Sequence, residues 1–308
     1  MKTRLPHVTF VLLGLLSTAL LWGPFTDTLR LALADSEFTH ILLILPVSAA
    51  LIFSEWKRTK PTVCWNWWTG LSLGAGAVLI ALWAKWGLGQ NPPDVRLSLD
   101  MVALMISWIG AFALCFGTSA VRSLWFPLGF LFWMVPIPSF LLVRIVQGLQ
   151  RGSAFAAWLL FSALNVPVSH QGIRLSIPGL NLEVARECSS IRSSLMLLVT
   201  TIVLAHLLLR TLWRKALVVA LAIPLSVAKN GLRIFTLGIL TTRVDPGFMN
   251  GRLHHQGGGV FFLIALLLIL LLIWVLGRGE GRASAPLSGE ASATLGVSLR
   301  RQNQLIRS

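Results

Sequence analysis

Charged residues are scarce in this chain. They make up 12% of its 308 residues, about half of the roughly 25% that is usual in soluble domains. Hydrophobic residues make up 55%, and the mean hydropathy is +0.77. This composition excludes an ordinary soluble globular protein and predicts a polytopic membrane protein.

Internal repeats, a soluble domain and a signal-peptide cleavage site are also missing. No period of roughly 20 to 50 residues recurs along the chain. Lys2 and Arg4 precede an apolar run, as they would in a signal peptide, but residues 22–25 lack the small-residue cleavage pattern. The first apolar run is therefore predicted to remain as a membrane span.

Apolar runs of about 20 residues, the length that crosses a bilayer, predict an all-α bundle of about eight transmembrane helices. The runs lie near residues 8–23, 38–53, 69–86, 100–117, 124–143, 190–209, 216–235 and 258–276. Residues 153–166 are apolar but short, and Asn165 and Pro167 close the run. This stretch is predicted to be interfacial or re-entrant, with nine spans as the alternative.

The distribution of basic residues orients the bundle. With both termini in the cytoplasm, the inner face carries 14 basic and three acidic residues, and the outer face carries 12 basic and eight acidic ones. Cytoplasmic loops favour Lys and Arg, so this orientation is predicted. Residues 1–277 then form the membrane domain, and 278–308 form a disordered cytoplasmic tail. The basic excess reflects membrane insertion and predicts no nucleic-acid partner.

Cysteine is rare, and its placement is informative. Of the three cysteines, the predicted topology puts Cys64 and Cys115 toward the cytoplasm and Cys188 on the outer face. A disulfide across the membrane is excluded by distance, so Cys188 remains a thiol in an oxidising compartment. It is either a small packing residue or a nucleophile.

Two further residues are predicted to reach the same membrane surface as Cys188. Counted at 1.5 Å per helical residue, Cys188, Arg233 and His254 each lie roughly 27 to 36 Å from the basic residues at the inner ends of their helices. Three C-terminal helices therefore present reactive or charged side chains at the outer face.

Each of these residues has a chemical use. A cysteine at a helix N-terminus is shifted toward the thiolate, and Arg192 adds to that field while Glu187 opposes it. A fixed cation such as Arg233 can stabilise the oxyanion of a tetrahedral intermediate. His254 or His255 can act as base and acid.

Plainer readings of the same residues stay open. Arg233, which shares a helix face with Lys229 and Asn230, could snorkel to the surface or form an ion pair with Asp245 or Glu187. An interfacial histidine could be a bystander. Neither a cofactor nor a metal site is predicted.

A short β-hairpin is predicted directly before Cys188. Residues 173–177 and 181–184 alternate in polarity around Pro178 and Gly179, which is typical of a hairpin. Its edge could hold an extended substrate by strand addition. Alternatively, the hairpin could be a plug packed on the bundle.

The residues around these three positions resemble the signature blocks of the exosortases, which are related to the archaeosortases. The blocks are residues 187–194, residues 223–224 with 229–234, and residues 253–258 with 261–262. The resemblance is strong over about 180–265, and the hydrophobic layout elsewhere is compatible with it.

The resemblance implies a membrane-embedded cysteine protease or transpeptidase. Such enzymes process exported proteins whose C-terminus carries a Pro-Glu-Pro motif, a membrane helix and a basic cluster. They act on the periplasmic side of the inner membrane, often beside exopolysaccharide genes. By position, Cys188 would be the nucleophile, Arg233 the transition-state stabiliser and His254 the acid-base group, with Asn230, Arg192 and Gly258 in support. The sorting-signal helix and membrane lipid would be the partners.

The chain departs from the family pattern in two places. The family commonly has glycine two residues after the cysteine, where this chain has Ser190. The tandem histidines leave the register open: Gly258 and Phe262, four and eight residues after His254, favour His254, with His255 as the alternative.

Other functions compete with a peptidase. A non-enzymatic permease or a structural subunit of polysaccharide export could use Lys229, Arg233 and the histidines to line an anion path. Transporters more often show broken helices at mid-membrane, whereas these polar residues cluster at one end. A membrane acyltransferase would also use an outer-face site.

Overall fold

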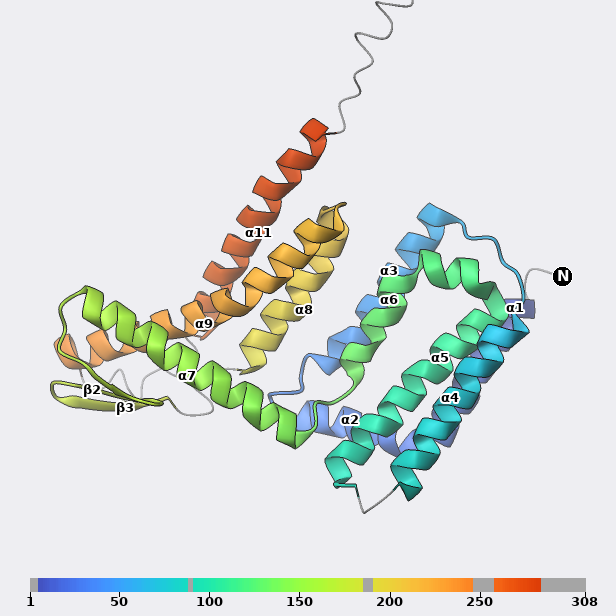
Figure 1. The fold of residues 1–308 in the computed structure, drawn as a ribbon, viewed down its shortest axis with the longest axis horizontal. Helices are drawn as coiled ribbons and strands as arrows, with labels where there is room; N and C mark the ends of the chain where they lie inside the picture. Colours follow the sequence, from blue (N-terminus) through green and yellow to red (C-terminus); the bar gives the residue numbers. More distant parts are fainter. Residues whose placement is uncertain (1–4, 88–90, 185–190, 246–257, 284–308) are drawn as a thin grey trace, which may run out of the picture. The chain divides into compact units, whose positions relative to one another are not determined.

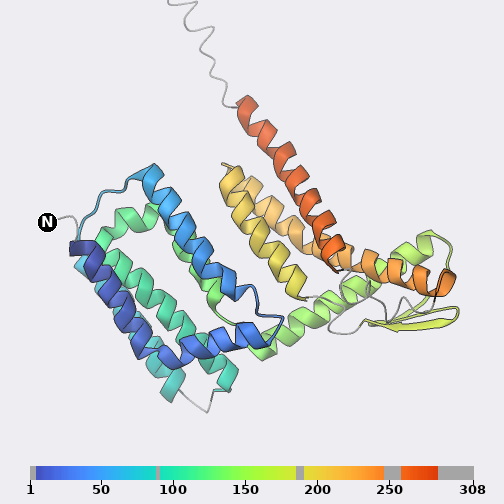
Figure 2. The same ribbon diagram turned by 180° about the vertical axis from the view of Figure 1, so that it is seen from behind.

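The structure, a computed structural model, is predominantly helical (Figures 1 and 2). It describes residues 5–87, 91–184, 191–245 and 258–283. Among these, five helices are long and apolar enough to cross a membrane, or up to seven if each of two bent pairs counts as one span. The predicted helical membrane bundle with a short hairpin is confirmed. The chain divides into two compact units, the second of which comprises residues 156–167, 178–180 and 197–308.

The first unit is organised around the antiparallel helices α4 (Trp67–Trp86) and α5 (Pro93–Ser123), and α1 (Leu5–Leu20) also packs on α5. Exposed tryptophans lie at both ends of α4: Trp67 and Trp68 at its start, and Trp83 and Trp86 at its end. The helix is about 30 Å long, the thickness of a hydrocarbon core. Tryptophan favours both membrane interfaces, so α4 has the length and the tryptophan placement of a bilayer-spanning helix.

The predicted span 100–117 ends where α5 kinks. Gly117 has φ +83°, which favours glycine, and a Cβ atom there would collide with the carbonyl oxygen of Cys64. The segment after α3 (Ile41–Thr59) runs back along this kink. The backbone N–H groups of Cys64 and Asn66 donate to the carbonyls of Phe116 and Leu114, at 3.4 and 3.3 Å.

Two predicted spans are broken in the structure. The run 8–23 bends by 79° between α1 and α2 (Trp22–Ala34). The run 124–143 becomes α6 (Trp125–Phe130), η1 (Leu131–Met134) and the start of α7 (Ser139–Ala163), with a 94° bend at the break. Prolines at 136 and 138 explain the second break, because the residue before a proline is driven out of the helical region.

This second break is held by the beginning of α5. The carboxylate of Asp94 accepts a hydrogen bond of 2.6 Å from the backbone N–H of Ser139, the first residue of α7. The hydroxyl of Ser98 donates to the carbonyl of Pro136 at 2.8 Å. Side chains from α5 thus satisfy backbone groups that the helix break frees.

The stretch 153–166, predicted to be interfacial or re-entrant, follows a 94° bend that marks either a broken span or a re-entrant loop. Most of this stretch is the second half of α7, a continuous 25-residue helix. Arg144 and Arg151 are exposed on one face of α7, whereas Val146, Ala154 and Phe161 are buried on another. A search for unbroken apolar runs misses such an amphipathic helix. The predicted end of the run near Asn165 is correct, because α7 ends at Ala163 and Asn165 adopts a left-handed φ of 56°.

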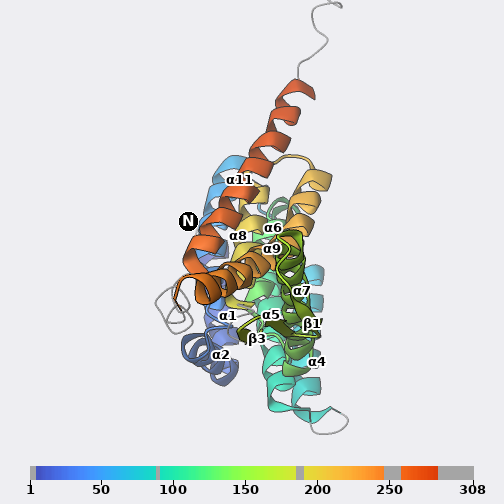
Figure 3. The same cartoon turned by 90° about the vertical axis from the view of Figure 1, so that its left-hand side faces the viewer.

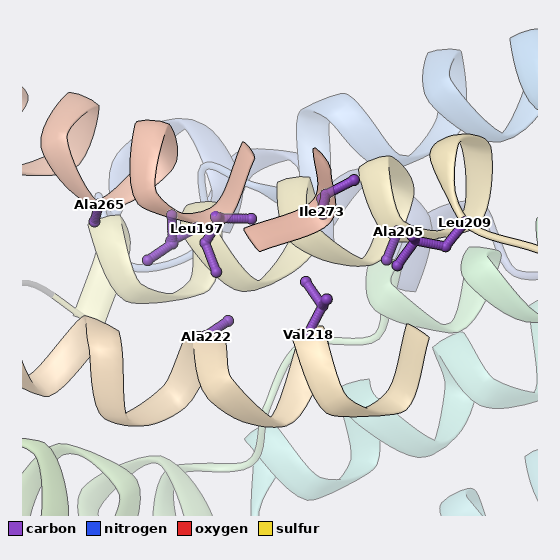
Figure 4. Packing of buried hydrophobic residues seen from close by; sticks show 8 residues of the cluster. Leu197, Ala205, Leu209, Val218, Ala222, Ala265 and Ile273 are labelled. Atoms are coloured by element: carbon purple, nitrogen blue, oxygen red, sulfur yellow. The ribbon is translucent and has the colours of Figure 1, made fainter. Parts of the chain in front are cut away.

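The second unit contains most of α8 (Ile191–Leu208), α9 (Leu212–Arg243) and α11 (Gly258–Ala283). Aliphatic side chains from all three helices meet in one core (Figure 4). The buried members are Leu197, Ala205, Leu209, Val218, Ala222, Ala265, Ile269 and Ile273. This core sets the register of α9 against α11.

The predicted hairpin is present and gains a third strand. The order is β1 (Ser169–Gln171), β2 (Arg174–Ile177) and β3 (Leu180–Glu183), and Figure 3 shows the strands beside α7. Gly179 has φ +82°, as the third position of a type II turn after a proline requires. Arg174 forms an exposed ion pair of 3.1 Å with Glu183 across the hairpin, and such a pair contributes little to stability.

Candidate active site

Three polar side chains on α9 are buried in a helix that is long and apolar enough to cross the membrane. Lys229, Asn230 and Arg233 are 6%, 2% and 8% exposed. Arg233 lies four residues after Lys229 and three after Asn230, so it shares a face of the helix with both. An ionisable group in such a helix is costly, and two of them on one face indicate a functional site.

The C-terminal part of α7 packs closely on this region of α9. A Cβ atom added at Gly231 would lie 2.5 Å from Cβ of Ala156 and 3.0 Å from the backbone nitrogen of Ala157. One turn further along α9, the rings of Phe235 and Phe161 meet edge to face with centroids 4.9 Å apart. These contacts fix the height and rotation of the α9 segment that carries Arg233.

The beginning of α11 lies against the arginine. A Cβ atom added at Gly258, the first described residue of α11, would lie 3.8 Å from Nη1 of Arg233. The predicted site residues Arg233 and Gly258 are therefore brought together from two helices. The same construction at Gly259 meets no atom within 4 Å, so Gly258 is the glycine that faces the guanidinium.

The opposite end of the same two helices is basic and aromatic. Nη1 of Arg214 donates to the carbonyl of Leu276 at 2.7 Å, and the Arg278 guanidinium lies 3.5 Å from the centroid of the Trp274 ring. From Arg214 to Arg233 the helix rises about 28 Å, close to one hydrocarbon thickness. Arg233 and Gly258 thus lie about one membrane width from this cluster.

The predicted nucleophile and both candidate histidines lie outside the described residues. Cys188 falls between Val184 and Ile191, which are both 2% exposed. The backbone N–H of Val184 donates to the carbonyl of Ile173, and its carbonyl accepts a 2.8 Å hydrogen bond from Nε2 of Gln150 on α7. The chain therefore enters the segment of Cys188 from an anchored position.

Arg192 is exposed in the first turn of α8. A solvated cation at this position raises the local positive potential without the cost of burial. Within the part of the chain that the structure describes, no group of three or more His, Cys, Asp or Glu side chains is placed to hold a metal ion.

The electrostatics around Arg233 favour an anion. The guanidinium faces the N-terminal end of α11, where backbone N–H groups and the helix dipole are also positive. Lys229 adds a second buried cation four residues earlier on the same face. Buried positive groups that converge in this way stabilise negative charge, such as the oxygen of a tetrahedral intermediate.

Two structural supports of the site were not predicted from the sequence. Gly231 permits the close approach of α7, and Arg214 ties the other end of α9 to α11. Gly231 stands between Asn230 and Leu232 in the second signature block, but the need for glycine there arises only from the position of α7. No sequence pattern names the carbonyl of Leu276 as the partner of Arg214.

The chain matches a known protein family. The model of the family described as transmembrane exosortase matches residues 9–271, which is more than half of the chain. No curated protein and no solved structure matches the chain.

Proposed function

The chain belongs to the transmembrane exosortase family, and we propose that it is a cysteine transpeptidase that cleaves the C-terminal sorting signals of exported proteins. The observation that carries this proposal is the buried Arg233, which faces the start of α11 about one membrane width from the basic cluster of Arg214 and Arg278. The arrangement fits the transition state of acyl transfer, because negative charge develops on a carbonyl oxygen there.

In the proposed reaction, the thiolate of Cys188 attacks the scissile carbonyl carbon and forms a C–S bond. Arg233 stabilises the resulting oxyanion. When the tetrahedral intermediate collapses, the C–N bond breaks and the histidine gives a proton to the leaving amine. Water or an amine then attacks the thioester and gives up a proton to the histidine, the C–S bond breaks, and the thiolate is regenerated.

His254 is the proposed acid-base residue, with His255 as the alternative. His254 precedes Gly258 by four residues, and four residues of chain span at most about 14 Å. Since Gly258 lies against Arg233, the covalent chain keeps either histidine within that reach of the glycine. This supports a shared role for the two signature blocks.

The proposed substrate is an exported protein with a C-terminal membrane helix. Lateral packing of that helix on the bundle would supply binding energy, and its basic cluster would remain in the cytoplasm. The scissile segment, which contains the Pro-Glu-Pro motif, would then lie at the periplasmic face of the inner membrane. Strand β3 is an edge of the three-stranded sheet, and Cys188 follows it in the sequence. An extended substrate could therefore add as a further strand beside β3. A role in exopolysaccharide or biofilm production is part of this proposal.

The proposal is tested by substrate processing in cells. A C-terminally tagged exported protein with a Pro-Glu-Pro motif, a membrane helix and a basic cluster is expressed with wild-type protein, Cys188→Ala or the matched control Cys64→Ala. We expect the tag to be released with the wild type and the control, and to be retained with Cys188→Ala at equal membrane abundance. Release of the tag by Cys188→Ala would refute the mechanism.

A further inference from the structure

The first unit contains a cavity of about 360 Å³ that the reaction does not use. Three elements form it: the bend between α1 and α2, the second half of α4, and the first half of α5. Most of its wall is aliphatic, including Leu20, Ala77 and Ala81. The volume lies within the range of small-molecule pockets, which starts at about 300 Å³.

The charged side chains of this cavity are unusual for a membrane bundle. Lys85, Arg96 and Asp100 all line it, so its described lining carries two cations and one carboxylate. Nε of Arg96 lies 3.9 Å from the carboxylate of Asp100, whose side chain is 11% exposed. Asp100 and Arg96 form a long ion pair at the wall, and Lys85 leaves the lining with a net positive charge.

The charges lie at the membrane boundary of the cavity. Lys85 is the last residue but one of α4, and Arg96 stands in the first turn of α5. The exposed tryptophans Trp83 and Trp86 accompany Lys85, and tryptophans of this kind sit at the headgroup level. The wall runs from there toward Ser107, about 16 Å further along α5 from Arg96. The cavity therefore has a cationic mouth at the interface and an aliphatic interior.

A second cavity of equal volume in the same unit provides a contrast. It is lined by residues such as Phe10, Leu45 and Phe112, and carries no charged side chain among its described lining residues. Of these two cavities, the one with Lys85 and Arg96 combines an apolar wall with a charged mouth.

We propose that this cavity binds one anionic phospholipid. The phosphate group lies between Lys85 and Arg96, and one acyl chain runs along Ala81 and Ala77 toward the interior. Basic pockets between membrane helices bind anionic headgroups, and each Lys or Arg near an anionic membrane surface strengthens attraction to that surface about fivefold. Because the cavity belongs to the first unit, the bound lipid would fasten the α4–α5 hairpin to the α1–α2 bend.

The test is native mass spectrometry of the purified full chain. The protein is exchanged into an equimolar mixture of phosphatidylglycerol and phosphatidylcholine with identical acyl chains. We expect one phosphatidylglycerol to be retained on each chain, with at least a fivefold preference over phosphatidylcholine. Equal retention of the two lipids would overturn the proposal.

Three variants test whether the preference for phosphatidylglycerol arises at this cavity. Lys85→Gln removes one exposed cation and is expected to lower the preference about fivefold. Ala81→Phe fills the aliphatic part and is expected to lower retention of both lipids. Arg58→Gln, on α3 and outside the cavity, removes the same charge and serves as the matched control, with a change below about twofold. Equal losses for Lys85→Gln and Arg58→Gln would assign the preference to general surface charge and overturn the proposal.

A competition experiment tests whether the acyl chain is part of the site. We expect inorganic phosphate at millimolar concentration to leave phosphatidylglycerol bound, because it lacks the chain that fills the cavity. Full displacement by phosphate would overturn the proposed lipid site. None of these readouts depends on cleavage of a sorting signal, so their outcome is separate from that of the transpeptidase proposal.

Discussion

The guanidinium of Arg233 is an expensive group for a membrane helix to bury. At the centre of a bilayer an arginine costs about 2.5 to 3.5 kcal/mol. Lys229 on the same helix face and the positive start of α11 add to this cost, and an anion bound at the site would offset it. The residue is therefore placed where a cation can bind an anion.

Gly258 and Gly259 provide a matched pair that tests this placement. A larger side chain at position 258 would displace the Arg233 guanidinium, whereas position 259 is open. We expect Gly258→Leu to lower the rate of substrate cleavage by at least tenfold, which is the effect of about 1.4 kcal/mol in the transition state. Gly259→Leu should retain a rate near that of the wild type.

The measurement is single-turnover release of the substrate's C-terminal helix at equal protein concentration. Gly258→Ala is an intermediate case, since its Cβ makes an ordinary contact at 3.8 Å, and it should keep most of the activity. Equal rates for Gly258→Leu and Gly259→Leu would show that the contact between α11 and Arg233 does not matter for catalysis.

At this scale the sequence identifies the polar residues of α9 and the glycine near Arg233, but not the residue that supports them. Arg233, Asn230 and Gly258 are singled out by spacing, residue type and the signature blocks, and the structure places Gly258 against Arg233. Gly231 is found only in three dimensions, because its role depends on where Ala156 of α7 lies.

Among the elements, α7 and α9 define the site through their close contact. Gly231→Ala would place a methyl group 2.5 Å from Cβ of Ala156, so one of the two helices must shift. We expect a loss of about 1 to 3 kcal/mol in stability, the usual effect of overpacking, together with lower activity. Thermal unfolding of the purified protein in detergent measures the first effect.

The matched control is Gly148→Ala, on the exposed face of α7, where an added Cβ meets no atom within 4 Å. Alanine is the better helix former there by up to about 1 kcal/mol, so stability should be unchanged or increased. A Gly231→Ala protein as stable as wild type would mean that the helices are not in close contact at this position.

The broken elements show what hydropathy alone misses. The run 124–143 is almost entirely apolar, so length and composition predict one span, but Pro136 and Pro138 separate one helix from the next. In α7, the exposed polar residues interrupt an apolar run without interrupting the helix. Strand β1, which was not predicted, pairs with β2. Such pairing leaves no recognisable pattern in the residues of the strand itself.

For the whole molecule, membrane orientation is the main prediction that the helices alone do not establish. An impermeant thiol reagent added to intact spheroplasts should label Cys188 and spare Cys64 and Cys115. After permeabilisation, Cys64 should be labelled because it is exposed, whereas Cys115 should still be spared because it is buried. Labelling of Cys64 from outside would invert the predicted topology and place the candidate site in the cytoplasm.

The central claim is that Cys188 carries the substrate as a thioester. The most direct measurement is mass spectrometry of the purified protein quenched in acid during a single turnover with a C-terminally tagged substrate. The account predicts a hydroxylamine-sensitive adduct of the substrate's N-terminal fragment on the peptide that contains Cys188. The adduct should persist in Cys64→Ala and be lost in Cys188→Ala. Cleavage of the substrate by Cys188→Ala, or an adduct on another residue, would contradict the account.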